Sequence, residues 1–149
     1  MSRTSRGFTL IEMLIVVVLI VIGTMIAIPR IRPVMTRQQV DRAAQLVASD
    51  MRSAFTSAAR GRIPIRVTFT PSSTNYTVAS RVTGATVVKR QFSGTDLNVA
   101  SIAATTATLD IFPNGIATGA DTITVSGTGG YSRQVSVSRI GFVRVIPLP

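Results

Sequence analysis

The hydrophobic pattern divides the chain into three stretches with different periods. The first stretch, from Phe8 to Ile28, is almost uninterruptedly apolar. As an α-helix its 21 residues would be roughly 30 Å long, which is the thickness of the hydrocarbon core of a bilayer. The run therefore predicts a transmembrane helix at residues 8–28.

In the second stretch, residues 34–59, apolar positions lie three and four residues apart. This period predicts an amphipathic helix, and we interpret residues 29–61 as a continuation of the first helix that packs on the rest of the domain. Gly61 is placed to end it, with Arg60 in the last turn, where a cation complements the helix dipole. The apolar stripe consists of Val40, Ala44, Val47, Met51, Ala54, Phe55 and Ala58.

Two prolines lie between these stretches. Proline lacks an amide hydrogen and clashes with the preceding helical turn, so Pro29 and Pro33 predict a kink or a break in the helix. Equally, the two prolines could simply mark the junction between the membrane segment and the outer domain. The pattern leaves both interpretations open.

From Ile63 onward the period changes to two, which is typical of β-strands with one buried face. Seven short strands separated by turn residues predict an antiparallel β-sandwich of about seven or eight strands at residues 62–149, and an α+β fold overall. The Ala/Thr/Ser-rich segment 98–106 is interpreted as a loop or weak strand. The seven predicted strands are residues 63–69, 76–80, 86–92, 108–112, 122–126, 133–138 and 142–146.

Composition limits what this outer region can be. From Pro29 onward the chain has about 120 residues, enough for one small domain. The chain contains no Cys and no His. Without Cys there is no disulfide framework, and without His the usual pH switch and the usual His metal ligand are excluded.

A single carboxylate, that of Glu12, interrupts the first apolar stretch. An ionised carboxylate in a membrane segment costs about 3 kcal/mol, and less near the interface, so Glu12 calls for a partner. A secretory signal peptide would have a shorter apolar run and a small-residue cleavage site, whereas this run ends at Pro29 and Arg30. A plain membrane anchor fits the length but gives no reason for Glu12.

The residues around Glu12 carry a more specific signal. The sequence Arg-Gly-Phe-Thr-Leu-Ile-Glu-Met-Leu at residues 6–14 resembles the class III leader of type IV pilins and type II secretion pseudopilins. The resemblance implies that residues 1–7 form a leader cut off between Gly7 and Phe8 by a prepilin peptidase. It also implies that the new amino terminus at Phe8 is N-methylated and that the apolar helix is retained.

The same resemblance implies a partner for Glu12. In these families the carboxylate is expected to attract the Phe8 amine of an adjacent subunit, which would relieve two poorly solvated charges and set the register of a filament. Such a contact joins two different surfaces, so it builds an open helix rather than a closed dimer. We therefore expect other major and minor pilins or pseudopilins as partners.

Flanking charges do not fix the orientation of the span. Arg3 and Arg6 precede it, but Arg30, Arg32 and Arg37 follow it. Processing by a prepilin peptidase requires a cytoplasmic amino terminus, so the leader resemblance decides. We expect a single-pass protein of the inner membrane with a periplasmic carboxy-terminal domain.

Further resemblance lies in the carboxy-terminal half of the chain. It is similar to the GspH/FimT family of minor pseudopilins and minor pilins, which implies a structural subunit near the tip of a short pseudopilus used in type II secretion. The alternative is a FimT-like minor type IV pilin that binds DNA for uptake. The segments that carry the resemblance are residues 109–115, 122–125, 133–138 and 141–144.

Net charge gives the DNA-binding alternative some support. The chain carries a net charge of +10, and clustered cations hold phosphate backbones. In the FimT branch a terminal Gly-Arg-Val-Arg motif binds DNA, but this chain reads Gly-Phe-Val-Arg at residues 141–144. The resemblance therefore assigns DNA contact to Arg144, with Arg139 and Arg133 as possible neighbours. A bias in genome composition that favours arginine codons would also explain the charge.

An enzyme is the class that the sequence favours least. The chain has six acidic residues, and no pair of them has a recognisable catalytic spacing. There is also no phosphate-binding loop, nucleophile elbow or oxygen-rich metal loop. We expect no enzymatic activity, no cofactor and no metal.

Overall fold

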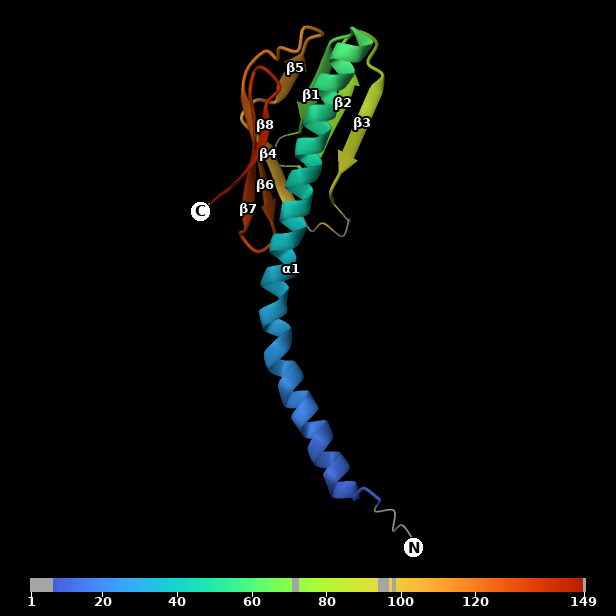
Figure 1. Ribbon diagram of the computed structural model, residues 1–149, viewed down its shortest axis with the longest axis vertical. Coiled ribbons are helices and arrows are strands. Elements are labelled where there is room, and N and C mark those ends of the chain that lie inside the picture. Colours follow the sequence, from blue (N-terminus) through green and yellow to red (C-terminus); the bar gives the residue numbers. More distant parts are fainter. Residues whose placement is uncertain (1–6, 71–72, 94–96, 98, 149) are drawn as a thin grey trace, which may run out of the picture. The chain divides into compact units, whose positions relative to one another are not determined.

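The structure, a computed structural model, describes residues 7–70, 73–93, 97 and 99–148, with only the backbone of residues 26–32. The chain divides into two compact units, Met1–Val34 and Met35–Pro149, and we call the second the head unit. Over these described residues, one α-helix and eight β-strands follow one another along the chain (Figure 1).

The helix α1 runs from Leu10 to Gly61. Its backbone stays helical across both prolines, so the break considered from the sequence does not occur. Proline loses one helical hydrogen bond and crowds the preceding turn, but its fixed φ is close to the helical value, so the backbone can continue as a helix. The helix ends at Gly61 as predicted, and Arg62 follows with a positive φ of 51°.

The eight strands form two four-stranded antiparallel sheets, with orders β3-β2-β1-β5 and β4-β6-β7-β8. Figure 1 shows them as two layers beside the second half of α1. The strands are β1 Ile65–Phe69, β2 Asn75–Ser80, β3 Thr86–Gln91, β4 Val99–Ala104, β5 Thr108–Ile111, β6 Asp121–Gly127, β7 Ser132–Val137 and β8 Val143–Pro147.

The predicted α+β class and the seven predicted strands are confirmed, with ends that differ by one or two residues. The segment 98–106, for which the sequence predicts a loop or weak strand, contains β4, which pairs with β6 along its length. Its register shifts between Val99 and Ser101, so a bulge interrupts the alternation of buried and exposed positions.

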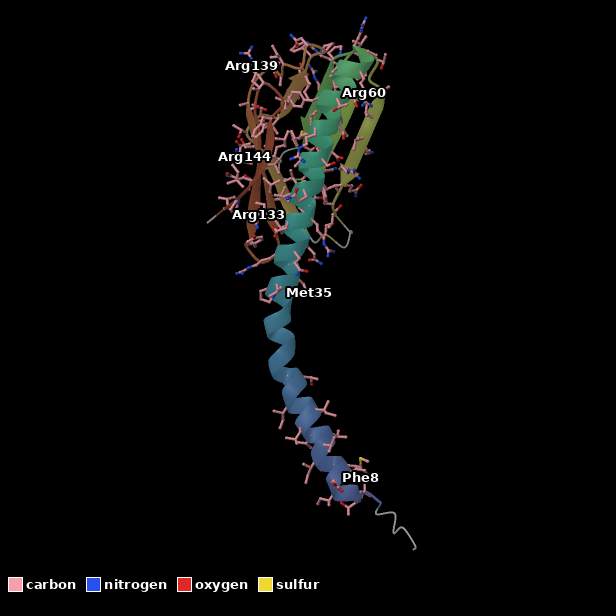
Figure 2. All side chains as sticks on the ribbon, viewed as in Figure 1. Phe8, Met35, Arg60, Arg133, Arg139 and Arg144 are labelled. Atoms are coloured by element: carbon pink, nitrogen blue, oxygen red, sulfur yellow. The ribbon has the colours of Figure 1, made fainter. Side chains whose placement is uncertain are left out.

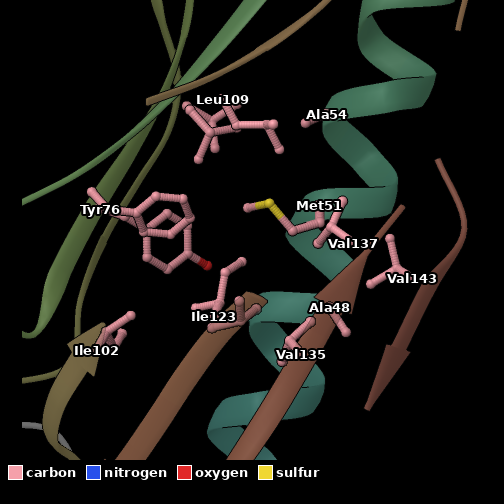
Figure 3. Close-up of a cluster of buried hydrophobic side chains, with 14 of the residues drawn as sticks. Ala48, Met51, Ala54, Tyr76, Ile102, Leu109, Ile123, Val135, Val137 and Val143 are labelled. Atoms are coloured by element: carbon pink, nitrogen blue, oxygen red, sulfur yellow. The ribbon is translucent and has the colours of Figure 1, made fainter. Parts of the chain in front are cut away.

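The core of the head unit lies between α1 and the two sheets. Every residue of the predicted apolar stripe is buried, and Ala43 and Ala48 are buried with it. Figure 3 shows Met51 extending from the helix toward Tyr76 of β2, with Val137 of β7 beside it and Ile123 of β6 below. The prediction that this stripe packs on the sheets is confirmed.

Within the part of the chain whose side chains are described, no helix is long and apolar enough to cross a membrane. The span predicted at residues 8–28 includes residues 26–28, whose side chains lie outside the described residues.

Candidate functional site

The predicted cleavage site lies immediately before the helix. Gly7 and Phe8 are non-helical and exposed, with Phe8 73% accessible, and α1 begins two residues later at Leu10. A protease needs a segment of chain outside regular structure, because a helical peptide bond is enclosed by its own turn. The bond between Gly7 and Phe8 meets this condition. Residues 1–6 of the predicted leader lie outside the described residues.

Glu12 lies in the first turn of α1, close to that bond. The amide of Glu12 donates a hydrogen bond to Thr9 Oγ1 at 3.2 Å, so Thr9 caps the helix. Threonine followed three residues later by glutamate is the capping-box pattern, which the sequence contains and which we missed. A carboxylate in the first turn is also favoured by the helix dipole. Glu12 is therefore suited to stabilise its own helix as well as to face a partner.

Around Glu12, the helix surface from Leu10 to Met25 is almost entirely apolar. Large hydrophobic side chains from Leu10 to Met25 are each about half exposed or more, with Leu10 at 84%. An apolar surface of this extent marks contact with protein or lipid, since water solvates it poorly.

A second candidate site lies at the β7–β8 hairpin, where the sequence placed Arg139 and Arg144. Both arginines are exposed, and the Arg144 guanidinium lies 5.4 Å from the centre of the Phe142 ring. Phe142 is itself 58% exposed and Ile140 is 77% exposed. A shallow groove of about 280 Å³ follows the hairpin, lined by Ser136, Ser138, Phe142, Arg144 and Ile146.

Gly141 of the Gly-Phe-Val-Arg sequence has a structural reason to be glycine. Its φ is +82°, in the left-handed region, and a Cβ placed there would lie 2.9 Å from Cδ1 of Phe55. The turn is closed by Gly141 N–H donating to Ser138 O at 3.1 Å. This glycine therefore lets the hairpin pack closely on α1, whatever the hairpin binds.

Arg133 is not brought together with the other two predicted arginines. Its guanidinium makes a bidentate ion pair with Asp41 of α1, and Tyr131 also donates to Asp41. Figure 2 shows Arg139 near the end of the head unit where α1 ends, Arg133 toward the opposite end, and Arg144 between them. Arg133 fastens β7 to the helix, a contact that sequence spacing could not reveal.

A buried carboxylate fastens the other sheet to the helix. Asp50 of α1 accepts hydrogen bonds from Tyr76 Oη at 2.7 Å and from Arg90 Nε and Nη2 at 2.6 and 3.0 Å. Burial, and then the hydrogen bond to Asp50, raise the pKa of the Tyr76 hydroxyl far above its usual range, so it stays a donor. Arg52 adds a link to β8 by donating to the carbonyl oxygen of Val143 at 3.0 Å.

The remaining described carboxylates of the head unit are also engaged. Asp110 pairs with Arg66 across β1 and β5 at 2.6 Å, with Arg81 at 3.5 Å. The hydrogen bond from Arg66 lowers the pKa of the Asp110 carboxyl. Asp121 is 2% exposed and accepts hydrogen bonds from the amide and hydroxyl of Thr106. Each of these carboxylates therefore links two segments of the head unit.

Comparison with known families supports the resemblances noted in the amino-terminal and carboxy-terminal parts of the chain. Residues 2–28 match the prokaryotic N-terminal methylation motif, and residues 43–141 match the family described as type II transport protein GspH. Both resemblances inferred from the sequence are thereby confirmed. No protein of curated function matches the chain significantly.

Solved structures show the same fold. The type IV minor pilin FimU of Pseudomonas aeruginosa superposes with a TM-score of 0.59 and 17% identity, over 76% of this chain and 90% of FimU. The minor pseudopilin EpsH from the type 2 secretion system of Vibrio cholerae superposes with a TM-score of 0.56 and 14% identity, over 73% of this chain and 97% of EpsH. At these identities the likeness establishes the fold alone.

Proposed function

Since this chain belongs to the family of type II transport protein GspH, we propose that it is a minor pseudopilin of a type II secretion system. In this role it is a structural subunit near the tip of a short periplasmic pseudopilus, without enzymatic activity. The observation that carries the proposal is the order of the two matches in one chain, a methylation motif at residues 2–28 and a GspH region at residues 43–141.

Processing and membrane insertion follow from the same proposal. A prepilin peptidase cuts between Gly7 and Phe8 and the new terminus is methylated. The retained helix is held in the inner membrane, with the amino terminus cytoplasmic and the head unit periplasmic. The exposed apolar side chains from Leu10 to Met25 support this arrangement, because lipid or neighbouring helices would cover them.

Assembly rests on Glu12. Once Phe8 carries the terminal amine, Glu12 of one subunit pairs with that amine on a neighbour, while the apolar surfaces pack together in the filament core. Replacing Glu12 by leucine is expected to leave insertion and cleavage intact and to reduce the amount of the chain in sheared filaments. Incorporation equal to that of the wild type would contradict the pairing.

Deletion of the gene tests the cellular role. We expect protein secretion to fail and natural transformation to continue. If secretion continued and DNA uptake failed, the FimT-like alternative would replace this proposal.

The β7–β8 hairpin supports that alternative, a minor type IV pilin that binds DNA. Its exposed Arg139 and Arg144 could contact phosphates, and the exposed Phe142 offers a stacking surface where the DNA-binding branch has arginine. A salt titration of DNA binding by the full chain, compared with Arg144→Ala, tests it. Absence of binding at low salt would exclude this function.

A further inference from the structure

The outward face of α1 in the head unit is polar and carries only positive charges. Its residues follow one another at spacings of three and four, so they lie on one side of the helix, opposite the buried stripe. We call them the exposed helix face: Gln38, Arg42, Gln45, Ser49, Arg52, Ser53, Thr56 and Arg60, all of them exposed.

This face carries a shallow, open depression toward its carboxyl end. A groove of about 350 Å³ is lined by hydroxyl groups and two guanidinium groups, those of Ser49, Arg52, Ser53, Thr56, Ser57 and Arg60. Among the described residues Arg42 and Arg60 have no ion-pair partner, and Arg52 donates only to a backbone carbonyl. The cations of this face are therefore available to carboxylates of another molecule.

The head unit itself cannot supply those carboxylates from its described residues. Its four described acidic side chains each hold an internal contact: Asp41 with Arg133, Asp50 with Arg90 and Tyr76, Asp110 with Arg66 and Arg81, and Asp121 with Thr106. A second copy of this chain would bring the same cations to the interface, and the net charge of +10 falls only to about +8 when the leader with Arg3 and Arg6 is removed. Contact between two copies through this face is thus opposed by like-charge repulsion.

We propose that the exposed helix face packs against an acidic surface of a different pilin-like subunit, and not against another copy of this chain. The inference rests on the proposed function as a filament subunit. It adds that the neighbour at this face has the opposite charge, because charge complementarity favours an acidic partner and like-charge repulsion disfavours a second copy there.

The spacing of the cations favours a protein partner over a nucleic acid. Arg42, Arg52 and Arg60 are separated along the helix by about 15 and 12 Å, at about 1.5 Å per residue. DNA carries a charge about every 1.7 Å along its axis and is held by denser cation clusters. Between the arginines lie Gln, Ser and Thr side chains, which can both donate and accept hydrogen bonds with the side chains of another protein.

Site-specific photo-crosslinking in the native bacterium tests the proposal with the full chain. A benzophenone amino acid replaces Ser53 on the exposed helix face, and in a second strain it replaces Val17 in the apolar part of the helix. Mass spectrometry identifies each cross-linked peptide. We expect the Ser53 position to capture a different pilin-like subunit through a peptide with net negative charge, and no homodimer to form.

Charge variants then separate electrostatic docking from mere proximity. Arg42→Glu should reduce the Ser53 product about tenfold, corresponding to a loss of about 1.4 kcal/mol. Arg42→Lys should retain the product. The matched control Lys89→Glu, the same charge reversal on the exposed edge strand β3, should leave it unchanged. Arg60→Glu provides a second, independent reversal on the same face.

Several outcomes would overturn the inference. They are a homodimer through Ser53, capture of a neutral or basic peptide, capture of nucleic acid, and equal losses in Arg42→Glu and Lys89→Glu. If Val17 still captured pilin-like subunits in those cases, the proposed function would stand and only this inference would fail. If neither position captured a pilin-like subunit, the proposed function would fail as well.

Discussion

Replacing Gly141 by alanine is expected to destabilise the head unit by about 3 kcal/mol, from two separable causes. The first is the backbone: φ is +82°, and the left-handed region costs an alanine about 1–2 kcal/mol. The second is a steric clash, because the new Cβ would lie 2.9 Å from Cδ1 and 3.2 Å from Cε1 and Cγ of Phe55. Phe55 is 9% exposed, so its ring has little room to move, and overpacking of this kind costs about 1–3 kcal/mol.

Gly130→Ala isolates the backbone contribution. Gly130 has a φ of +77°, and a Cβ added there would meet nothing within 4 Å. Gly130→Ala should therefore lower the free energy of unfolding by only about 1–2 kcal/mol, which is the cost of placing an alanine in the left-handed region. The difference between the two variants measures the contact with Phe55.

Urea unfolding of the full chain in detergent, followed by tyrosine fluorescence, gives both free energies of unfolding. In a Phe55→Leu background the extra cost of Gly141→Ala should shrink, since the ring that obstructs the Cβ is gone. Equal losses for Gly141→Ala and Gly130→Ala, or an unchanged difference in that background, would refute the packing explanation of this glycine.

Three further predictions concern the contacts that hold the elements in place. Asp50→Asn should lower the free energy of unfolding by about 2 kcal/mol in urea titrations, because it leaves the half-exposed Arg90 without its buried counter-charge, and an unchanged midpoint would contradict this. Arg66 lowers the pKa of Asp110 below its ordinary 3.8, so the stability from this pair is complete above that pH and is lost as the pH falls through the lowered pKa. In urea titrations, the free energies of unfolding of the wild type and Asp110→Asn should therefore differ by a constant amount near neutral pH and converge in strong acid. A difference that persists in strong acid would contradict the claim that the Asp110 pair provides this stability. Thr9→Ala should destabilise the first helical turn by about 1 kcal/mol, seen as faster amide hydrogen exchange in that turn, and unchanged exchange would show that the cap is dispensable.

The fold was predictable where the local pattern is regular. The stripe from Val40 to Ala58 keeps a period of three and four through the head unit, and β1 and β6 alternate strictly between buried and half-exposed positions. Such periods report which side of an element faces the core, so they need no knowledge of what the core contains.

The strand β4 was uncertain for a physical reason. Its buried residues Val99 and Ile102 lie three apart, because the bulge between Val99 and Ser101 removes the period of two. Its other residues are Ala and Ser, which have weak strand preference. Pairing with β6 stabilises the strand, and that pairing is a long-range contact.

The candidate sites also divide into those marked by a local sequence pattern and those that depend on long-range contacts. Gly7, Phe8 and Glu12 could be proposed from sequence because their spacing along the chain matches the N-terminal methylation motif, and their roles remain predictions. The positions of the arginines could not be, because whether a cation is free depends on the element packed against it. Arg133 meets Asp41 across 92 positions of sequence, while Arg139 and Arg144 meet no described carboxylate.

Mass spectrometry of the amino-terminal peptide of the chain, purified from the membranes of its own bacterium, tests the central claim most directly. A processed filament subunit should yield a peptide that begins at Phe8 and carries one added methyl group, with residues 1–7 absent. A peptide that still begins at Met1, or one cut after the apolar helix, would contradict the account.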